Sequence, residues 1–431
     1  MKVAFCSLGC KVNQYESDCY AKIFRDKGYS IGSFDEICDV YVVNTCSVTN
    51  IGDRKSRKML RRAKKLNPDA IVVATGCYAQ TRQEEIKKMS EVDLVIGTSD
   101  RHKIADMVDA VRKGENVDIL RDILKEKYYE ELEAEGEIER TRAYIKIQDG
   151  CNNFCSYCII PYARGPVRSR KMENIIKEAK SLSEKGFCEV VLTGISVASY
   201  GKDLNCDTSL SDVIKNVSDV SGITRIRLSS IDPRAFTDDF IKFLSENEKI
   251  CRHFHISLQS GSKTVLKRMN RKYTPDEYME VLNKIRKAMP DASITTDIIC
   301  GFPEETEEEF NETLEFVKKA NFLKVHVFPY SERSGTAAAL MPQLPLPLRE
   351  ERAKILGNLE QEIGDDYERS FIGKEAEVLF EQTSENYIEG LTKNYLRVYT
   401  KADSALCGTV CKVKITEKKS GKLFGSLITH L

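Results

Sequence analysis

The sequence predicts an α/β protein in three parts: a doubly wound amino-terminal α/β domain, a central partial (β/α)6 barrel and a small carboxy-terminal antiparallel β-barrel. Strand-like runs alternate with helical stretches over about the first 115 residues and again from Arg142 onward. After residue 370 the pattern changes to short strands separated by Gly, Asn or Asp. Alternation of this kind indicates parallel sheets, and closely spaced short strands indicate an antiparallel barrel. We place the domains at residues 1–116, 141–370 and 371–431, with a linker at 117–140.

Four β-branched runs with intervening helices define the first domain. Helices are expected at 14–28, 52–66, from about Arg82 and at 102–114, and strands at 3–8, 40–45, 70–75 and 93–97. The segment from Lys125 to Arg140 carries seven acidic against three basic side chains. That composition favours an interdomain linker, with a negatively charged recognition helix as the alternative.

Six further strand–helix units follow. Their strands are expected at 143–148, 189–194, 225–231, 255–261, 294–301 and 325–330. Six such units suit a partial parallel barrel, which places its chemistry at the carboxyl ends of the strands. A proline-led helix at about 344–370 then precedes the strands of the small barrel, expected at 374–382, 387–392, 397–402, 411–417 and 423–428.

Whole-chain composition excludes several classes of protein. The 66 basic and 66 acidic side chains cancel, so total charge does not point to a polyanionic partner. We expect no membrane association, because no run of eighteen apolar residues occurs. The opening MKVAFCSLGCKVNQ has too short an apolar stretch for a secretion signal, so we expect a cytoplasmic protein. An odd count of fifteen cysteines in a long chain argues against a disulfide scaffold.

Three cysteines lie close together in DGCNNFCSYC, at Cys151, Cys155 and Cys158. They follow the first expected barrel strand. A closed zinc site needs four protein ligands, and no histidine is nearby. A cubane [4Fe–4S] cluster held by three thiolates keeps one iron open for a ligand. The alternatives are a structural zinc knuckle or three buried thiols.

The CxxxCxxC spacing, with Tyr157 before its last cysteine, resembles the signature of the radical S-adenosylmethionine (SAM) superfamily. The resemblance implies that the open iron binds SAM, and that an electron from the cluster cleaves it to a 5′-deoxyadenosyl radical. It also implies a low-potential electron donor such as flavodoxin or ferredoxin. Later strand ends match further SAM-contact motifs of the superfamily, although each alone has an ordinary turn or core interpretation: Thr193 and Gly194, Gln259 and Ser260, and Gly301 and Phe302.

A second set, Cys10, Cys46 and Cys77, is far apart in sequence, but each cysteine lies just beyond an expected strand of the first domain. The ends of parallel strands share one edge of a sheet, so these thiols can converge. From position alone, a second open cluster and buried cysteines both remain possible.

LGCKVNQYES, NTCSVT, ATGCYAQ and GCNNFCSYCIIPYARGPVRSR together resemble the methylthiotransferases of the radical SAM superfamily, over essentially the whole chain. The resemblance implies two [4Fe–4S] clusters, one on each cysteine triplet, and a carboxy-terminal domain similar to the TRAM RNA-binding module. It implies that one SAM methylates a sulfur on the auxiliary cluster. A second SAM provides the radical that activates C2 of an adenosine, so each turnover uses two equivalents. The immediate sulfur donor stays open.

The family has three main branches, which act on isopentenyl-adenosine in tRNA, on threonylcarbamoyl-adenosine in tRNA, and on an aspartate of a ribosomal protein. LGCKVNQYES is most similar to the threonylcarbamoyl-adenosine branch, whose substrate lies beside the anticodon. In place of Lys11 and Val12 the isopentenyl branch tends to have Gln–Met, and the ribosomal branch Pro–Lys. A non-catalytic iron–sulfur RNA-binding sensor is the alternative from a different class, and it would not need the SAM motifs.

RNA binding has some support from charge and aromatic content. The run from Asp53 to Lys65 has eight basic side chains against one acidic, and a helix would align Lys58, Arg61, Arg62 and Lys65 as a stripe. A solvated helix face is the plain alternative. Three arginines after the cysteine loop are candidates to steer the target nucleotide: Arg164, Arg168 and Arg170. Three tyrosines of the small barrel are candidates to stack on bases or to fill its core: Tyr387, Tyr395 and Tyr399.

Overall fold

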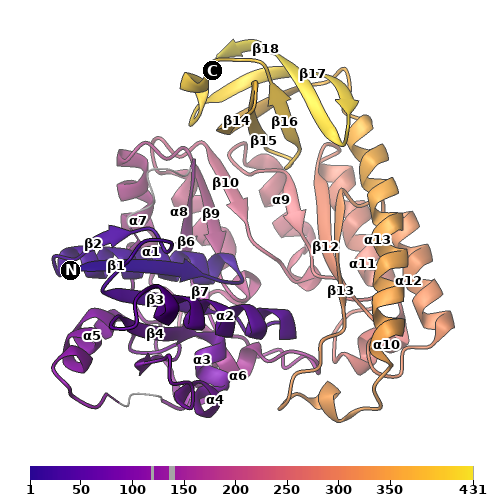
Figure 1. Ribbon diagram of the computed structural model, residues 1–431. Helices are drawn as coiled ribbons and strands as arrows, with labels where there is room; N and C mark the ends of the chain where they lie inside the picture. Colours follow the sequence, from indigo (N-terminus) through magenta and orange to yellow (C-terminus); the bar gives the residue numbers. More distant parts are fainter. Residues whose placement is uncertain (118–120, 135–140, 431) are drawn as a thin grey trace.

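The computed structural model describes residues 1–117, 121–134 and 141–430. The amino-terminal domain lies beside a larger α/β barrel, and a small β-barrel caps one end of that barrel (Figure 1). A long helix, α13 (Leu346–Arg369), leads from the large barrel to the small one. In the described part of the chain, no helix is both long and apolar enough to cross a bilayer.

The first domain is a five-stranded parallel sheet of order β2-β1-β3-β4-β5. Four of its strands were predicted, and the three-residue β2 was not. Helices α1 and α5 cover one face of the sheet and α2 and α3 the other, as a doubly wound fold requires. The bounds are β1 Lys2–Ser7, β2 Ser30–Gly32, β3 Val40–Thr45, β4 Ile71–Gly76, β5 Leu94–Val95, α1 Lys11–Asp26, α2 Asn50–Leu66, α3 Cys77–Thr81, α4 Gln83–Lys87 and α5 Ile104–Arg112.

The central domain has the six predicted parallel strands, arranged as two three-stranded sheets of order β10-β9-β6 and β11-β12-β13. Isolated parallel bridges, such as Ile231 with Ile256, join the two sheets into an open barrel. Helices on the outside bury the main apolar core. The strands are β6 Arg142–Lys146, β9 Glu189–Thr193, β10 Arg225–Leu228, β11 His253–His255, β12 Ser293–Cys300 and β13 Lys324–Pro329, with a short antiparallel pair of β7 Gln148–Asp149 and β8 Arg168–Ser169.

The helices of the central domain follow their strands. A capping box on Thr306 and Glu309 starts α12. The bounds are α6 Ile160–Arg164, α7 Met172–Glu184, α8 Leu210–Ser218, α9 Asp238–Glu246, α10 Lys263–Arg268, α11 Pro275–Ala288 and α12 Glu307–Ala320.

The carboxy-terminal strands close into a barrel of order β14-β15-β16-β18-β17. The expected antiparallel pairing holds except between β16 and β18, which run parallel. The end of β15 and the loop after it dock on the amino ends of the large barrel's strands. There the carbonyl of Leu391 accepts a bond of 3.0 Å from Arg225, and the carbonyl of Asn394 accepts one of 2.5 Å from Ser293. The bounds are β14 Glu375–Ser384, β15 Tyr387–Thr392, β16 Arg397–Thr400, β17 Val410–Lys419 and β18 Lys422–His430.

Candidate cluster and cofactor site

The three-cysteine loop begins at Gly150, directly after β7. Gly150 has φ +74°, and a Cβ there would lie 1.8 Å from the carbonyl oxygen of Pro166. Only glycine fits such a close approach in the left-handed region. The amide of Cys151 donates to the carbonyl of Gly165 across 3.0 Å, and that of Cys158 to Cys155 across 2.9 Å. The loop is thus fixed by its backbone.

The thiols of this loop lie close enough to influence one another. Burial raises the pKa of Cys158 to about 12, and the neighbouring thiols of Cys155 and Cys151 add to the rise. Arg271 donates an N–H to the sulfur of Cys155 across 3.3 Å. Binding iron would remove the thiol protons, and cationic N–H donors stabilise the resulting thiolates.

The second triplet gathers at the carboxyl edge of the first domain's sheet. Cys46 follows β3 directly, Cys77 follows β4 directly, and Cys10 lies three residues after β1. A Cβ on Gly9 would lie 2.7 Å from the sulfur of Cys46, which shows how closely the two loops approach. Burial, with Cys77 and then Cys10 nearby, raises the pKa of Cys46 to about 12. The three strand ends therefore bring the three thiols together.

Neither triplet has the close spacing of sulfurs that a single metal ion requires. In a tetrahedral zinc site, Zn–S bonds of about 2.3 Å hold sulfurs about 3.8 Å apart. Across the described residues, the one group of three or more ligand atoms mutually within 4.8 Å is His255, Asp297 and His326. Neither cysteine triplet meets that limit. An iron–sulfur cube, which takes each thiolate on a different iron, fits the triplets better.

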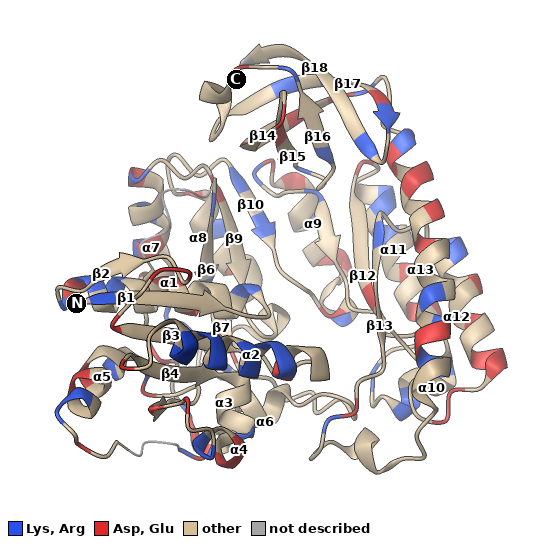
Figure 2. Ribbon diagram, in the orientation of Figure 1, with Lys and Arg blue, Asp and Glu red and all other residues tan. Residues whose placement is uncertain are grey.

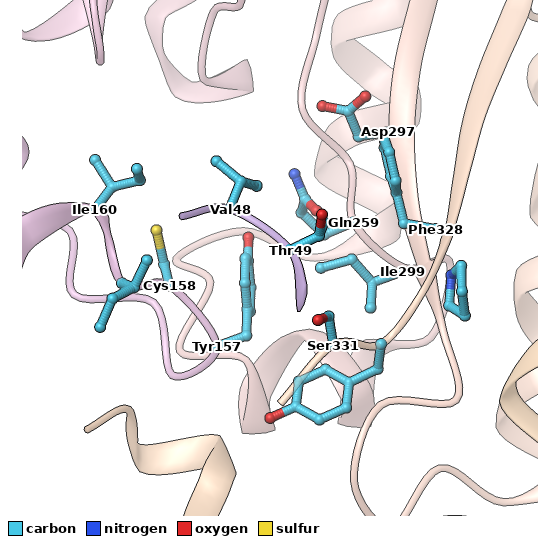
Figure 3. Close-up of a pocket in the computed structure, with 13 residues that line it drawn as sticks. Val48, Thr49, Tyr157, Cys158, Ile160, Gln259, Asp297, Ile299, Phe328 and Ser331 are labelled. Atoms are coloured by element: carbon cyan, nitrogen blue, oxygen red, sulfur yellow. The ribbon is translucent and has the colours of Figure 1, made fainter. Parts of the chain in front are cut away.

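A pocket lies between the two domains, lined by Cys158 of one triplet and by the residues two and three positions after Cys46 of the other (Figure 3). Cys158 lies on one side of it and Asp297 and Phe328 on the other. Val48 and Thr49, which closely follow Cys46, project between them. The full lining is Val48, Thr49, Tyr157, Cys158, Ile159, Ile160, Gln259, Asp297, Ile299, Phe328, Pro329, Tyr330 and Ser331.

Of the six SAM-contact positions expected beyond the cysteine loop, the pocket wall includes Gln259, and it also includes Tyr157 from within the loop. Gln259 has φ +76°, a strained conformation that non-glycine residues adopt mainly where function fixes it. Thr193, Ser260, Gly301 and Phe302 are buried and Gly194 is half-buried, and none of them belongs to the pocket wall.

A polar group from three neighbouring strands adjoins this pocket. His255 lies 3.1 Å from Asp297, and the ring of His326 lies 5.7 Å from that of His255. Thr295 holds the other ring nitrogen of His255 at 3.0 Å. Two imidazoles and a carboxylate at this spacing can hydrogen-bond a sugar or chelate a metal ion.

The arginines expected to steer RNA are instead buried, which corrects that prediction. Arg164 is 0 % exposed and bonds Glu16 and Asn13, the latter across 2.7 Å. Arg170 is 1 % exposed and bonds Glu178. Arg168 is 2 % exposed and lies next to Asp149. Buried carboxylates compensate these cations, so the arginines stay inside the protein.

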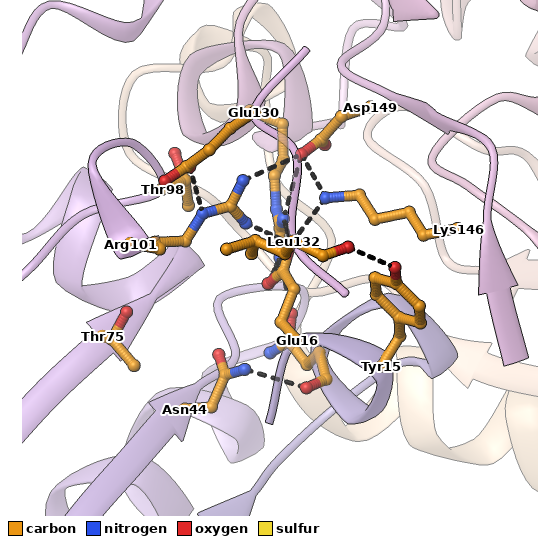
Figure 4. Close-up of polar contacts among 12 residues, drawn as sticks. Tyr15, Glu16, Asn44, Thr75, Thr98, Arg101, Glu130, Leu132, Lys146 and Asp149 are labelled. Carbon is orange, nitrogen blue, oxygen red and sulfur yellow. Dashed lines mark hydrogen bonds and ion pairs between the residues drawn. The ribbon is translucent and has the colours of Figure 1, made fainter. Parts of the chain in front are cut away.

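A buried ion network connects the first domain with the barrel (Figure 4), and Arg164 belongs to it through Glu16 and Asp149. Glu16 on α1 pairs with Arg101 and Arg164, and with Lys146 of β6 across 2.7 Å. Lys146 also pairs with Asp149 across 2.6 Å. Burial opposes ionisation of Glu16, but the three cations outweigh it and keep the pKa of Glu16 well below its usual range.

The predicted linker contributes to the same seam. Glu130 pairs with Arg101 across 2.9 Å, and the carbonyl of Leu132 accepts from the hydroxyl of Tyr15 across 2.7 Å. Residues 121–134 therefore pack between the first domain and the barrel. Sequence composition showed their acidity but not the buried arginines that they meet.

The remaining RNA candidates divide by exposure. Lys58, Arg61, Arg62 and Lys65 are exposed along α2, which Figure 2 shows as a basic helix. Tyr387 and Tyr399 are half-buried on the small barrel. Tyr395 is different, because its ring stacks on His253 at 4.3 Å and lies 4.9 Å from the guanidinium of Arg227. The ring also packs against the core of the small barrel, which is one of the two roles expected for it, and its contacts with His253 and Arg227 do not favour stacking on a base.

The sequence did not point to the pocket residues Val48, Thr49, Asp297, Phe328 and Ser331. They come from three separate segments, and no local motif links them. One signal was present: β13 alternates buried and more exposed positions, with His326 and Phe328 on the exposed face.

Comparison with known proteins identifies the family. Residues 145–317 match the Radical SAM superfamily, and residues 2–97 match Uncharacterized protein family UPF0004. The chain is 45% identical to the Bacillus subtilis threonylcarbamoyladenosine tRNA methylthiotransferase MtaB, covering 96% of this chain and 93% of that one. It is 44% identical to the MtaB of Aquifex aeolicus, over 92% and 96% of the two chains. It is 38% identical to a tRNA-2-methylthio-N(6)-dimethylallyladenosine synthase of Thermoanaerobacter, over 97% and 91%.

Solved structures share the fold at low sequence identity. The radical SAM methyltransferase TsrM of Kitasatospora setae aligns with a TM-score of 0.58 and 14% identity, over 79% of this chain and 77% of that one. The cobalamin-dependent radical SAM enzyme OxsB aligns with a TM-score of 0.52 and 11% identity, over 85% and 56%. A radical SAM enzyme uses a [4Fe–4S] cluster with SAM, which agrees with the three-cysteine loop. Because relatives more than 30% identical cover nearly the whole chain, the protein belongs to the radical SAM methylthiotransferase family.

Proposed function

We propose that this enzyme converts N6-threonylcarbamoyladenosine, beside the anticodon of tRNA, to its 2-methylthio derivative. The observation that carries the proposal is the pocket between the two cysteine triplets, lined by Cys158 from one and by Val48 and Thr49 next to the other. A nucleoside held there would have a radical source on one side and a sulfur source on the other. The names of the two relatives at 44–45% identity support the threonylcarbamoyl substrate.

Two [4Fe–4S] clusters would be held by the two triplets, Cys151 with Cys155 and Cys158, and Cys10 with Cys46 and Cys77. When bound, the clusters supply the electron that cleaves SAM and the iron that carries the transferred sulfur. Around them the protein provides N–H donors: Arg271 reaches Cys155 and Arg164 reaches Cys77, each across 3.3 Å. A low-potential flavodoxin or ferredoxin would supply electrons, and the proposal leaves the sulfur donor open.

SAM would lie along the pocket wall formed by Tyr157, Gln259 and Ile299. The backbone of Gln259 is fixed by bonds to β12, donating to Asp297 across 2.8 Å and accepting from Ile299 across 2.9 Å. A side chain held this way can orient a bound ligand without first losing conformational entropy. Thr193, Gly194, Ser260, Gly301 and Phe302 would support the site through backbone and packing.

The RNA would reach the pocket along α2. Thr49 lines the pocket and also caps this helix, accepting from the amide of Gly52 across 3.1 Å. The exposed basic stripe from Lys58 to Lys65 follows along the same helix, over about 10 Å of its axis. A strand of RNA bound to this stripe would therefore arrive at the pocket.

The small barrel offers a second contact for RNA. The half-buried rings of Tyr387 and Tyr399 lie 5.1 and 5.9 Å from that of Phe424. Lys401 and Lys422 lie over the two tyrosine rings, at 5.8 and 4.7 Å. Aromatic rings beside cations suit unstacked bases and their phosphates.

The test is mass spectrometry of tRNA nucleosides made by the reconstituted enzyme with SAM and dithionite. We expect 2-methylthio-N6-threonylcarbamoyladenosine from tRNA that carries the precursor, with 5′-deoxyadenosine released. Methylthiolation of isopentenyl-adenosine alone would favour the second tRNA branch, and a modified ribosomal aspartate the third. Failure to cleave SAM with both clusters loaded would favour a non-catalytic sensor.

A further inference from the structure

The interior of the large barrel holds an unusual concentration of charge at its amino end. Alternate residues of β6, β9 and β10 face inward there, and Glu189 lies at the centre. Arg225 pairs with Glu189 across 2.6 Å and Arg227 across 2.9 Å, while Arg142 lies 3.9 Å away. Three arginines thus share one buried carboxylate.

Other groups compensate this excess of positive charge only in part. Glu381 of the small barrel pairs with Arg142 across 2.9 Å. Backbone carbonyls accept from Arg225 and Arg227, but Nη1 of Arg225 is buried and has no hydrogen-bond partner among the residues that the structure describes. Two carboxylates therefore face three guanidinium groups before any further cation is considered.

Lys11 adds a fourth cation. It is half-buried, and within residues 1–117, 121–134 and 141–430 no hydrogen bond or ion pair reaches its ammonium group. Its electrostatic neighbours are Arg227, Arg142 and Glu189. Its positive charge also contributes to lowering the pKa of His253 and of His326, which lie in the opposite sheet. The charge of Lys11 is thus close enough to influence residues of both sheets of the barrel.

The position of Lys11 relates this charge to the reacting atoms. Lys11 directly follows Cys10 and is the first residue of α1. The sulfur must reach C2 of the adenine from the cluster that Cys10 would help to hold. With C2 turned toward that cluster, the edge of the adenine that carries C2, N1 and the N6 substituent would face the start of α1, where Lys11 lies.

The candidate substrates differ in charge at that place. A threonylcarbamoyl group ends in a carboxylate, whereas an isopentenyl group is a hydrocarbon. A carboxylate that entered the interior would meet an unpaired ammonium and a local excess of positive charge. A hydrocarbon would instead have to desolvate the ammonium with no compensating bond.

We propose that Lys11 binds the carboxylate of the substrate's N6-threonylcarbamoyl group and thereby selects that nucleoside over uncharged N6 substituents. The inference rests on the proposed function, because it assigns a substrate contact within the same site. Arg142 and Arg227 serve as positioning residues, which maintain the positive potential that attracts the carboxylate. A charge-assisted bond of this kind contributes to affinity and to discrimination.

The test compares wild type with Lys11→Met, Lys11→Arg and Lys180→Met, all reconstituted with iron and sulfide. Lys180 is an exposed lysine on α7, remote from the pocket lining, and provides the matched loss of charge. The substrates are two anticodon stem-loops, one with the threonylcarbamoyl group and one with its methyl amide, in which a neutral group replaces the carboxylate. Iron content and the electron paramagnetic resonance of both clusters report whether Cys10 still binds iron.

We expect Lys11→Met to lower kcat/KM on the charged stem-loop by about tenfold to a hundredfold, as loss of a charge-assisted bond predicts. On the methyl amide, wild type and Lys11→Met should be alike. Lys11→Arg should retain most of the preference for the charged stem-loop over the methyl amide. Lys180→Met should retain all of that preference.

The outcomes separate the two claims. If wild type does not methylthiolate the charged stem-loop, the proposed function fails. The role of Lys11 is wrong if wild type methylthiolates the charged stem-loop but Lys11→Met shows the same preference for it over the methyl amide. The role is also wrong if Lys11→Met keeps both clusters but loses activity equally on the two substrates. If Lys11→Met loses iron, Lys11→Gln is measured instead, again as the ratio of kcat/KM on the charged stem-loop to kcat/KM on the methyl amide. A ratio equal to that of wild type, or loss of iron in Lys11→Gln as well, counts against the role of Lys11.

Discussion

The guanidinium of Arg164 donates its Nε–H to the sulfur of Cys77 across 3.3 Å. Arg164 ends α6, six residues after Cys158, whereas Cys77 belongs to the other triplet. One side chain therefore connects the segment that follows the radical cluster loop with a proposed ligand of the second cluster. Hydrogen bonds to sulfur raise the reduction potential of an iron–sulfur cluster.

Replacing Arg164 with Lys should preserve the charge but lose the planar N–H donor. We expect the auxiliary cluster to become harder to reduce, and methylthio product to fall at least tenfold while SAM cleavage continues. Anaerobic redox titration followed by electron paramagnetic resonance measures the potential. An unchanged potential with full product formation would show that the contact does not influence the cluster.

Gly150 offers a test of how the cysteine loop is fixed. Gly150→Ala would place a methyl group 1.8 Å from the carbonyl oxygen of Pro166, so the loop must move. We expect it to lose about half of the bound iron and most SAM cleavage. Gly186→Ala is the control, because Gly186 has φ +89° and a Cβ there meets nothing within 4 Å. That variant should lose only about 1 kcal/mol of unfolding free energy and keep its activity. Equal losses in the two variants would mean that backbone strain alone explains the effect.

Sequence alone was sufficient where the signal is local. The β-branched runs predicted the barrel strands, and the spacing of Cys151, Cys155 and Cys158 predicted their shared loop. Cys10, Cys46 and Cys77 could be related because strand ends of a parallel sheet share one edge. Each of these inferences depends on periodicity or spacing along the chain.

The burial of the arginines could not be predicted from periodicity or spacing. Arg164 and Arg170 look like surface cations until their partners are known, and the partners Glu16 and Glu178 lie in other elements. A buried cation is stable only beside a compensating carboxylate, and that pairing is set by tertiary structure. For the same reason Tyr395 gave no sign that it would stack on His253.

The basic stripe of α2 predicts a salt-dependent contribution to RNA binding. Neutralising four side chains together should weaken tRNA binding and reduce the slope of log K against log salt by about 0.7–0.9 for each phosphate that the protein no longer neutralises. Filter binding at several salt concentrations measures the slope. The same change at Lys318 and Lys319 on α12, which are also exposed, is the control. An unchanged slope would show that the stripe is a solvated helix face that does not bind RNA. The residues to neutralise are Lys58, Arg61, Arg62 and Lys65.

Glu189 predicts a pH-dependent stability. Burial alone would raise its pKa, but Arg227 and Arg225 lower it to about 2. Since the folded pKa is below the unfolded value of about 4.3, the stabilisation is complete above that pH and is lost as pH falls toward 2. Its full size is on the order of 3 kcal/mol.

Urea unfolding of the apoprotein tests this without interference from acid release of iron. Glu189→Gln should be less stable than wild type at neutral pH, because its arginines lose their carboxylate. The difference should shrink as pH falls below about 4. A difference that stays constant from pH 7 to pH 3 would contradict the assigned role of the carboxylate.

The most direct measurement is the iron and acid-labile sulfide content of anaerobically reconstituted protein, in wild type and in two triple cysteine-to-alanine variants, one for each triplet. We predict about eight iron atoms per wild-type chain and about four in each variant, with SAM cleavage kept only where Cys151, Cys155 and Cys158 remain. About four iron atoms in wild type, or stoichiometric zinc at either triplet, would contradict a reaction chamber built between two clusters.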